Sequence, residues 1–275
     1  MENNFNRFSI AAEGGRTSDC VSSFDETISF VIPAYNEEAR IGRVLDELCS
    51  KIEERKLRAD VIVMVDGNDG TEGIVLHYSS CYPFVRYFKN CGRNGKGAAV
   101  RRSLPYITGK YVMLMDADNS VSAEELFRLL DYANAGDVII ANRYAMHENN
   151  IPALRRFLSY CFNILVRASL GIRVRDTQSG YKLCKSDVFV EGMKRVGVTN
   201  TFFDVSFLYH LKLMKKMAIE VPVKYTYDER STFSPVGEVL GQGVSLLSFR
   251  IRHSRFSKYV PDFARKLYFR KFRWI

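Results

Sequence analysis

Short apolar runs alternate along the chain with longer segments in which apolar side chains recur every three or four residues. In the first half, the short runs predict buried strands at 28–32, 61–65, 85–88, 111–115 and 137–141. The longer segments predict helices at 37–52, 71–78, 96–104 and 123–133. Strands that alternate with helices form βαβ units, so the pattern predicts an α/β fold with a mainly parallel sheet flanked by helices.

The second half of the chain is less regular. It predicts helices at 154–170, at 203–217 and from 236 onward, short strands at 181–184 and 219–225, and a polar loop at 175–180. Since no internal repeat or linker interrupts the pattern, we expect one globular domain over 27–235. The polar tail at 1–26 is expected to be disordered, and 236–275 to form an amphipathic, basic helical segment.

Positive charge is concentrated near the C-terminal end. The chain has a net charge of +9, and residues 250–275 hold nine Lys or Arg against one Asp, a net charge of +8. Aromatic residues are interleaved with the basic ones, which is typical of a segment that lies on an anionic membrane surface. Packing on its own domain or on the partner of a homodimer is the alternative. Nucleic acid is the least favoured partner, and we expect none.

Other features of composition indicate a cytoplasmic protein. No apolar run reaches the roughly 18–20 residues of a spanning helix, so we expect no transmembrane helix. Residues 1–25 lack the apolar core of a secretory signal. The six cysteines are scattered without a CxxC pair, which is typical of reduced thiols.

Two carboxylates, Asp116 and Asp118, directly follow the apolar run at 111–115. A hard cation such as Mg²⁺ can be bound by carboxylate oxygens and by substrate phosphates at the same time. This pair therefore predicts a site for a metal-bound diphosphate. An EF-hand is excluded, because Val121 and Phe127 occupy its glycine and glutamate positions. A solvated turn is the alternative interpretation.

Polar clusters follow other predicted strands as well, at 33–37, 66–71 and 142–144. Ligands of parallel sheets bind beyond the carboxyl ends of the strands. Chance polar loops would fall at both ends of the strands. The distribution therefore favours a ligand site at one edge of the sheet.

Several short strings occur together: SFVIPAYNEE at 29–38, DGNDGT at 66–71, NGKGA at 94–98, NRY at 142–144 and DTQSGYK at 176–182. With the Asp116–Asp118 pair, they resemble the family-two glycosyltransferases of the GT-A fold, over about residues 27–252. Within that family, the chain is similar to the polyprenyl-phosphate hexose synthases, such as dolichyl-phosphate glucosyl- and mannosyltransferases. The resemblance implies a GT-A fold with a Rossmann-like sheet.

The resemblance also implies roles for individual residues. A nucleotide-sugar donor would contact Pro33, Ala34, Tyr35, Glu37, Asp66, Lys96, Asp116, Ala117 and Arg230. Mg²⁺ or Mn²⁺ would bind Asp116 and Asp118. The acceptor phosphate would contact Arg143 and Arg155, because guanidinium groups suit phosphate oxygens. The catalytic residues would be Asp118, Asp176, Gln178 and Asp204.

The chain departs from the family pattern at two positions. Val65 stands where the family has the first Asp of its second string, and that loop is one residue short, so the choice between uridine and guanosine stays open. Ser206 replaces a glutamate. A missing carboxylate matters for an alcohol acceptor, which needs a general base, but little for a phosphate monoester, which is ionised at pH 7.

The resemblance therefore implies an inverting transferase that moves glucose or mannose from a nucleotide-diphosphate sugar to polyprenyl or dolichyl phosphate. We expect it to be peripheral on the cytosolic face of a membrane. Two alternatives are kept: a soluble sugar or glycan as acceptor, and a non-catalytic nucleotide-binding protein.

Overall fold

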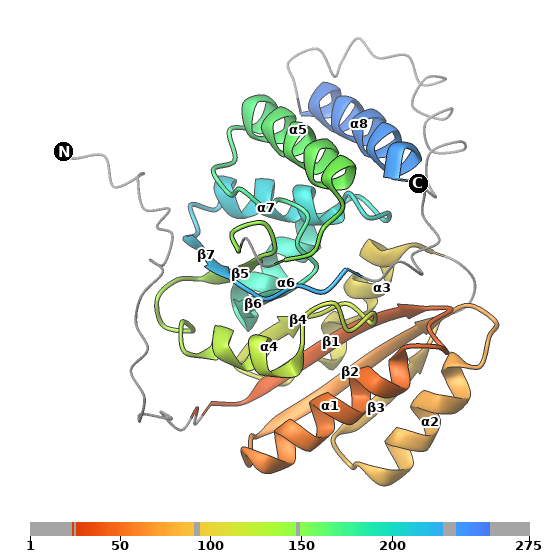
Figure 1. Cartoon of the computed structure of the whole chain (residues 1–275). Coiled ribbons are helices and arrows are strands. Elements are labelled where there is room, and N and C mark those ends of the chain that lie inside the picture. Colours follow the sequence, from red (N-terminus) through yellow and green to blue (C-terminus); the bar gives the residue numbers. More distant parts are fainter. Residues whose placement is uncertain (1–23, 25, 91–93, 147–148, 228–234, 254–275) are drawn as a thin grey trace.

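The computed structural model describes residue 24 and residues 26–90, 94–146, 149–227 and 235–253 (Figure 1). Its strands are β1 (Ile28–Tyr35), β2 (Ala59–Asp66), β3 (Val85–Lys89), β4 (Tyr111–Leu114), β5 (Val138–Asn142), β6 (Lys182–Lys185) and β7 (Ala218–Pro222). Its helices are α1 (Ile41–Glu54), α2 (Thr71–Cys81), α3 (Lys96–Ser103), α4 (Ala123–Leu130), α5 (Ala153–Leu170), α6 (Ser186–Arg195), α7 (Phe203–Leu213) and α8 (Pro235–Arg252). A short 3₁₀ turn covers Leu104–Tyr106.

The strands form one sheet in the order β3-β2-β1-β4-β6-β5-β7. All neighbouring strands pair in parallel except β6, which runs antiparallel to both β4 and β5. The prediction of a mainly parallel α/β sheet is therefore confirmed. The antiparallel direction of β6 was not predicted, because its four residues show no direction in their own pattern.

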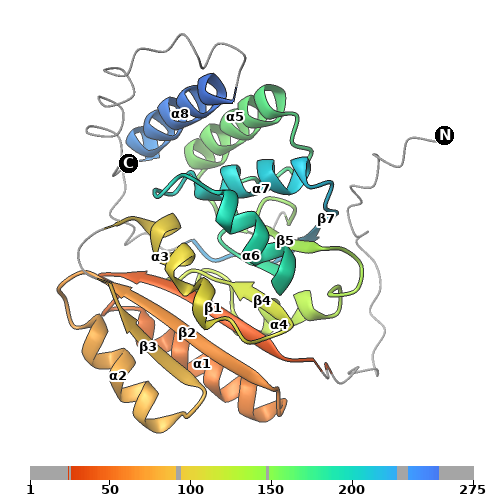
Figure 2. The same ribbon diagram turned by 180° about the vertical axis from the view of Figure 1, so that it is seen from behind.

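Each face of the sheet is covered by helices, because successive side chains of a buried strand point to opposite faces. Phe30 and Ile32 of β1 pack with α1, α2 and α4, whereas Val31 between them packs with α3, α6 and α7. These strand residues are at most 1% exposed, and burial of such a side chain stabilises the fold by about 1.5–3 kcal/mol. Two cores therefore lie on opposite faces of one sheet (Figures 1 and 2).

Helices α5 and α8 form an outer layer over α7, and both views show them side by side (Figures 1 and 2). Leu246 and Phe249 of α8 are buried in the same core as α7. Among the described residues, no helix is both long and apolar enough to cross a bilayer. The predicted tail at 1–26 lies almost entirely outside the described residues, as do 254–275 of the predicted basic segment.

The predicted elements are present, with shifts of a few residues at their ends. The largest shifts are in α1, which begins at Ile41 rather than at 37, and in α7, which ends at Leu213 rather than at 217. Helix α6 was missed, although Val188, Phe189 and Met193 recur at helical spacing and are buried. That spacing is the signal that would have found it.

Candidate active site

The carboxyl ends of β1 and β2 lie next to each other, because these strands pair in parallel and in register up to Tyr35 and Asp66. Strand β4 pairs with the other side of β1 and ends at Leu114, two residues before Asp116. The polar clusters that follow these strands therefore meet at one edge of the sheet, as predicted.

Strand β6 brings a further cluster to this edge. Lys182, its first residue, pairs with Leu114 at the end of β4 and with Ile140 near the end of β5. Because β6 runs antiparallel, the 176–181 segment that precedes it lies at the carboxyl edge of the neighbouring strands. The direction of one short strand thus joins the predicted DTQSGYK string to the predicted metal site.

Asp116 forms an ion pair with Lys96 at the start of α3. Each side chain is 23% exposed. Burial by itself would raise the pKa of Asp116, but Lys96, Arg143 and Lys182 together hold it below its usual value. A Cβ on Gly180 would overlap the carboxylate of Asp116, so glycine is needed here for the close approach of the two segments.

Two glycines position Lys96. Gly95 has a φ of +87°, which favours glycine, and a Cβ there would overlap the carbonyl of Thr199. A Cβ on Gly97 would lie 2.6 Å from the Cβ of Phe203. The start of α3 therefore sits directly against the segment that leads into α7, with the Lys96 ammonium 5.8 Å from the centre of the Phe203 ring.

Asp118 is half-buried, two residues beyond Asp116. Its carboxylate accepts hydrogen bonds from the Tyr181 hydroxyl at 2.8 Å and from the Ser120 amide at 3.0 Å. Burial, with Asp118 nearby, raises the pKa of Tyr181 well above its usual value, so this hydroxyl remains a donor. Sequence reasoning did not identify Tyr181 as a partner of the predicted metal ligand.

Glu37 adds a third carboxylate near this pair. Burial raises its pKa to about 7; Arg40, 2.6 Å away, opposes the shift, and the charges of Asp118 and Asp116 add to it. Its backbone amide donates to the Thr71 hydroxyl at 2.7 Å, which ties the end of β1 to the start of α2.

The oxygen atoms of Asp116 and Asp118 fit a hard cation. In the part of the chain that the structure describes, no group of three His, Cys, Asp or Glu side chains is arranged to hold a metal ion by itself. A cation here would therefore take further ligands from water or from substrate phosphates, which is usual for Mg²⁺.

A buried polar pair lies at the end of β2. The Oδ1 atom of Asp66 and the Nδ2 atom of Asn90 are both buried without a hydrogen-bond partner. Burial raises the pKa of Asp66, and the neighbouring Asn90 and Arg102 oppose the shift. An acceptor and a donor left unpaired together could bind the polar edge of a nucleobase. Asn90 was missed by the sequence reasoning; it directly follows β3, which ends at Lys89, one residue later than predicted.

Arg143 and Asp176 form a two-point ion pair with nitrogen–oxygen distances of 2.8 and 2.9 Å. Asp176 is completely buried, whereas the Arg143 side chain is 14% exposed. The Arg143 guanidinium also lies over the rings of Tyr144 and Tyr225, 5.5 and 5.6 Å from their centres. Asp176 therefore holds Arg143 in place while 14% of the Arg143 side chain stays exposed.

Arg155, near the start of α5, lies 4.9 Å from the centre of the Tyr227 ring. Tyr227 is two residues beyond Tyr225, which contacts Arg143. One segment after β7 thus contacts both predicted phosphate-binding arginines. The Thr226 amide of this segment donates to the Ser120 carbonyl at 2.8 Å, which places the segment next to the Asp116–Asp118 pair.

Lys182 and Asp204 form a buried ion pair, with side-chain exposures of 0% and 5%. The Lys182 ammonium also donates to the carbonyl of Ser179. Asp204 and Asp176 are thus both paired with cations in the interior. Their catalytic assignment stays a prediction.

Most of the remaining predicted residues lie along the same edge. Pro33 and Gln178 are half-buried, Ala34 and Ala117 are buried, and Tyr35 is 40% exposed. Ser206 is completely buried, and its hydroxyl has no hydrogen-bond partner. Arg230 lies outside the described residues.

Comparisons with known proteins agree with this geometry. A family model described as "Glycosyl transferase family 2" matches residues 29–192. The dolichyl-phosphate beta-glucosyltransferase of Drosophila melanogaster is 30% identical over 244 residues, which cover 82% of this chain and 75% of the relative. The Homo sapiens protein of the same name is 29% identical with the same coverage.

Solved structures of low sequence identity share the fold. Glucosyl-3-phosphoglycerate synthase from Mycobacterium tuberculosis, in complex with uridine diphosphate, superposes with a TM-score of 0.62 at 18% identity, covering 86% of this chain and 85% of that one. Mannosyl-3-phosphoglycerate synthase from Rubrobacter xylanophilus gives a TM-score of 0.57 at 16% identity, covering 82% and 74%. The predicted GT-A fold is confirmed.

Proposed function

Because the chain belongs to glycosyl transferase family 2, we propose that it transfers a hexose from a nucleotide-diphosphate sugar to polyprenyl or dolichyl phosphate. The observation that carries the proposal is the arrangement at the carboxyl edge of the sheet. There the carboxylates of Asp116 and Asp118 lie near Arg143 and Arg155. Both arginines contact tyrosines of the segment that follows β7. The names of the relatives favour glucose over mannose.

The donor would bind across the ends of β1, β2 and β4. Asp116 and Asp118 would hold Mg²⁺ or Mn²⁺, which when bound would neutralise the negative charge of the departing diphosphate. Lys96, already paired with Asp116, would supply a further positive charge near the same phosphates. Asp66 and Asn90 would face the base, with one unpaired acceptor and one unpaired donor.

The acceptor phosphate would bind Arg143 and Arg155, whose guanidinium groups suit phosphate oxygens. A phosphate oxygen would attack the anomeric carbon from the side opposite the diphosphate. One carbon–oxygen bond forms, the bond to the diphosphate breaks, and the configuration inverts. A phosphate monoester is largely ionised at pH 7, so no base has to remove a proton. This agrees with the buried position of Ser206 and with the ion pairs that engage Asp176 and Asp204.

A polyprenyl acceptor resides in a membrane, so we place the enzyme at the cytosolic membrane face as a peripheral protein. The basic, aromatic segment at 250–275 supports this placement through its charge of +8. A homodimer held by the same segment is the competing arrangement.

The proposal can be tested with purified protein, Mn²⁺ or Mg²⁺, polyprenyl phosphate in detergent and radiolabelled UDP-glucose or GDP-mannose. We expect label in the organic phase, lost with EDTA and reduced at least 100-fold in Asp118→Ala, because the metal-binding carboxylate is gone. Asp187→Ala is the matched control, since this carboxylate is exposed at the start of α6.

The other outcomes separate the alternatives. Release of nucleotide diphosphate without label in the organic phase would contradict the lipid acceptor and favour a soluble sugar or glycan. No release from either donor, with the protein folded, would favour a non-catalytic nucleotide-binding protein.

A further inference from the structure

A buried carboxylate, Glu220 of β7, lies next to the Arg143–Asp176 ion pair. It is 6% exposed, and three donors face its two oxygen atoms. The Oε1 atom accepts hydrogen bonds from the Asp176 amide at 2.9 Å and from the Asn142 side chain at 3.1 Å. The Oε2 atom accepts from the Arg175 amide at 3.0 Å. One side chain thus joins the end of β5 to the segment that precedes β6.

These hydrogen bonds meet on both sides of Arg143. Asn142 precedes Arg143 in the chain, and its Oδ1 atom accepts from the amide of Tyr144, which follows Arg143, at 3.0 Å. Asp176 holds the Arg143 guanidinium and also accepts from the Arg143 amide at 3.2 Å. The backbone of Arg143 and the ion-pair partner of its side chain are therefore both fixed by Glu220.

The contacts require an ionised carboxylate rather than an amide. Burial raises the pKa of Glu220, whereas the amides of Asp176 and Arg175 oppose the shift because they stabilise the charged form. A glutamine at this position would turn its NH₂ group toward at least one donor in either orientation. It would face the Arg175 amide in one orientation, and the Asp176 amide together with Asn142 in the other.

We propose that Glu220 is a positioning residue of the acceptor site, which orients the Arg143 guanidinium toward the acceptor phosphate through Asp176 and Asn142. The inference rests on the proposed lipid-phosphate acceptor, because that function gives Arg143 a phosphate to bind. Glu220 itself touches neither substrate in this scheme.

The effect of Glu220 should be confined to the acceptor side of the site. Thr177, which follows Asp176, is held separately, because its amide and hydroxyl donate to Asn163 of α5 at 2.9 and 2.6 Å. On the donor side, Asp116 is held by Lys96 at the start of α3. Loss of the Glu220 carboxylate should therefore weaken acceptor binding without weakening donor binding.

Isothermal titration calorimetry on the full chain tests this split. The probes are a short, water-soluble isoprenyl phosphate for the acceptor site and UDP or GDP with Mn²⁺ for the donor site. In Glu220→Gln we expect the Kd of the isoprenyl phosphate to rise about tenfold or more, because a small displacement of Arg143 weakens its charge-assisted hydrogen bonds to the phosphate. The Kd of the nucleotide should be that of wild type.

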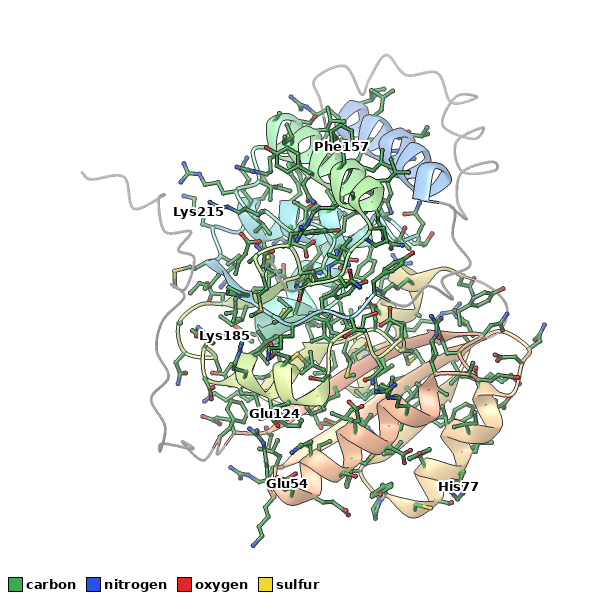
Figure 3. All side chains as sticks on the ribbon, viewed as in Figure 1. Glu54, His77, Glu124, Phe157, Lys185 and Lys215 are labelled. Atoms are coloured by element: carbon green, nitrogen blue, oxygen red, sulfur yellow. The ribbon has the colours of Figure 1, made fainter. Side chains whose placement is uncertain are left out.

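Asp137→Asn is the matched control. Asp137 joins the same two strands at their other ends, since it directly precedes β5 and accepts from the Met217 amide, which precedes β7, at 2.9 Å. Figure 3 shows its ion-pair partner Lys185 well apart from Phe157 of α5, the helix that carries Arg155. This variant should lower the Tm but bind both probes like wild type.

A double-mutant cycle tests the route through Arg143. Arg143→Met should weaken binding of the isoprenyl phosphate, and the addition of Glu220→Gln should cause no further loss, because the group that Glu220 positions is already gone. If Glu220→Gln does not fold, Asn142→Asp replaces it. That variant keeps an acceptor for the Tyr144 amide but sets a second carboxylate against Glu220, so the same rise in Kd is expected.

Three outcomes would overturn the proposal: unchanged binding of the isoprenyl phosphate by Glu220→Gln, equal weakening for both probes, or effects of the two substitutions that multiply independently. Transfer of labelled sugar to the isoprenyl phosphate by wild type decides the proposed function separately. Wild-type protein that binds this phosphate, with the expected split in Glu220→Gln, but transfers no sugar would contradict the proposed function and retain the role of Glu220. Wild-type protein that does not bind it would overturn both.

Discussion

Two ion pairs of the same chemistry lie within this molecule, and they differ mainly in burial. Lys96 and Asp116 are each 23% exposed at the carboxyl edge of the sheet, whereas Lys182 and Asp204 are 0% and 5% exposed beneath it. The first pair is partly solvated, so under the proposed function it would exchange its partners for a metal ion and phosphates. The second cannot, because separating buried charges leaves each unpaired in a medium of low polarity.

A third pair, Lys185 and Asp137, completes the series with exposures of 41% and 23% at the other end of the sheet. The comparison teaches that residue type and strand position do not separate a reactive pair from a structural one. The surrounding packing makes that difference, and the following variants test it.

The largest effect is expected for Lys182→Met. Removal of one partner from a buried pair leaves an uncompensated charge, so we expect the free energy of unfolding to fall by about 3–5 kcal/mol. Urea denaturation measures this change. The double variant Lys182→Met/Asp204→Leu should recover most of the loss, since both charges are removed. If Lys182→Met lowered the free energy of unfolding only as little as the loss of a surface ion pair does, the assignment of this pair as structural would be contradicted.

Gly180→Ala should affect activity more than stability. The added methyl group would overlap the Asp116 carboxylate and displace it from its position next to Lys96. We expect kcat/KM for the transfer reaction to fall about 100-fold, the size of effect that a displacement of about 1 Å can produce. Gly73→Ala in α2 is the matched control, because nothing lies within 4 Å of the position that its Cβ would occupy. A normal kcat/KM in Gly180→Ala would show that Asp116 does not act from this position.

Lys96→Met should separate the two pairs most directly. We expect kcat/KM to fall about tenfold or more, because a positive charge near the donor phosphates is lost. The fall in unfolding free energy should be less than half of that in Lys182→Met, because the Lys96 pair is partly solvated. Equal destabilisation by the two substitutions would remove the distinction that we draw.

The smallest effect is expected at Asp137 and depends on pH. Burial by itself would raise its pKa, but the Met217 amide and Lys185 hold the pKa below its usual value. The carboxylate therefore stabilises the fold above the ordinary aspartate pKa of about 3.9, and this stabilisation is lost as the pH falls through the lowered value. The Tm difference between wild type and Asp137→Asn should be present at pH 6 and shrink toward pH 2–3. A difference that grows on acidification would contradict this sign.

Much of the candidate site was predictable from residues at the ends of predicted strands. Lys96, Asp116 and Asp118 were assigned to one site, and the structure brings Lys96 to Asp116. Tyr181 and Asn90 were missed as site residues. Tyr181 belongs to an apolar-looking strand start, and nothing local shows that its hydroxyl reaches Asp118, 63 positions away. The sequence also could not distinguish whether Asp176 and Asp204 are catalytic or positioning residues, because that depends on the side chains with which they pair.

The sequence by itself determined the alternation of strands and helices, the edge of the sheet where the polar clusters gather, and the basic character of the end of the chain. These properties depend on periodicity and on the order of neighbouring residues. Only the tertiary structure decided that β6 runs antiparallel, which charged pairs are buried, and that α5 leaves an apolar face uncovered. Those properties depend on contacts between residues far apart in the chain, because the burial of a charge or of an apolar face is set by what packs against it.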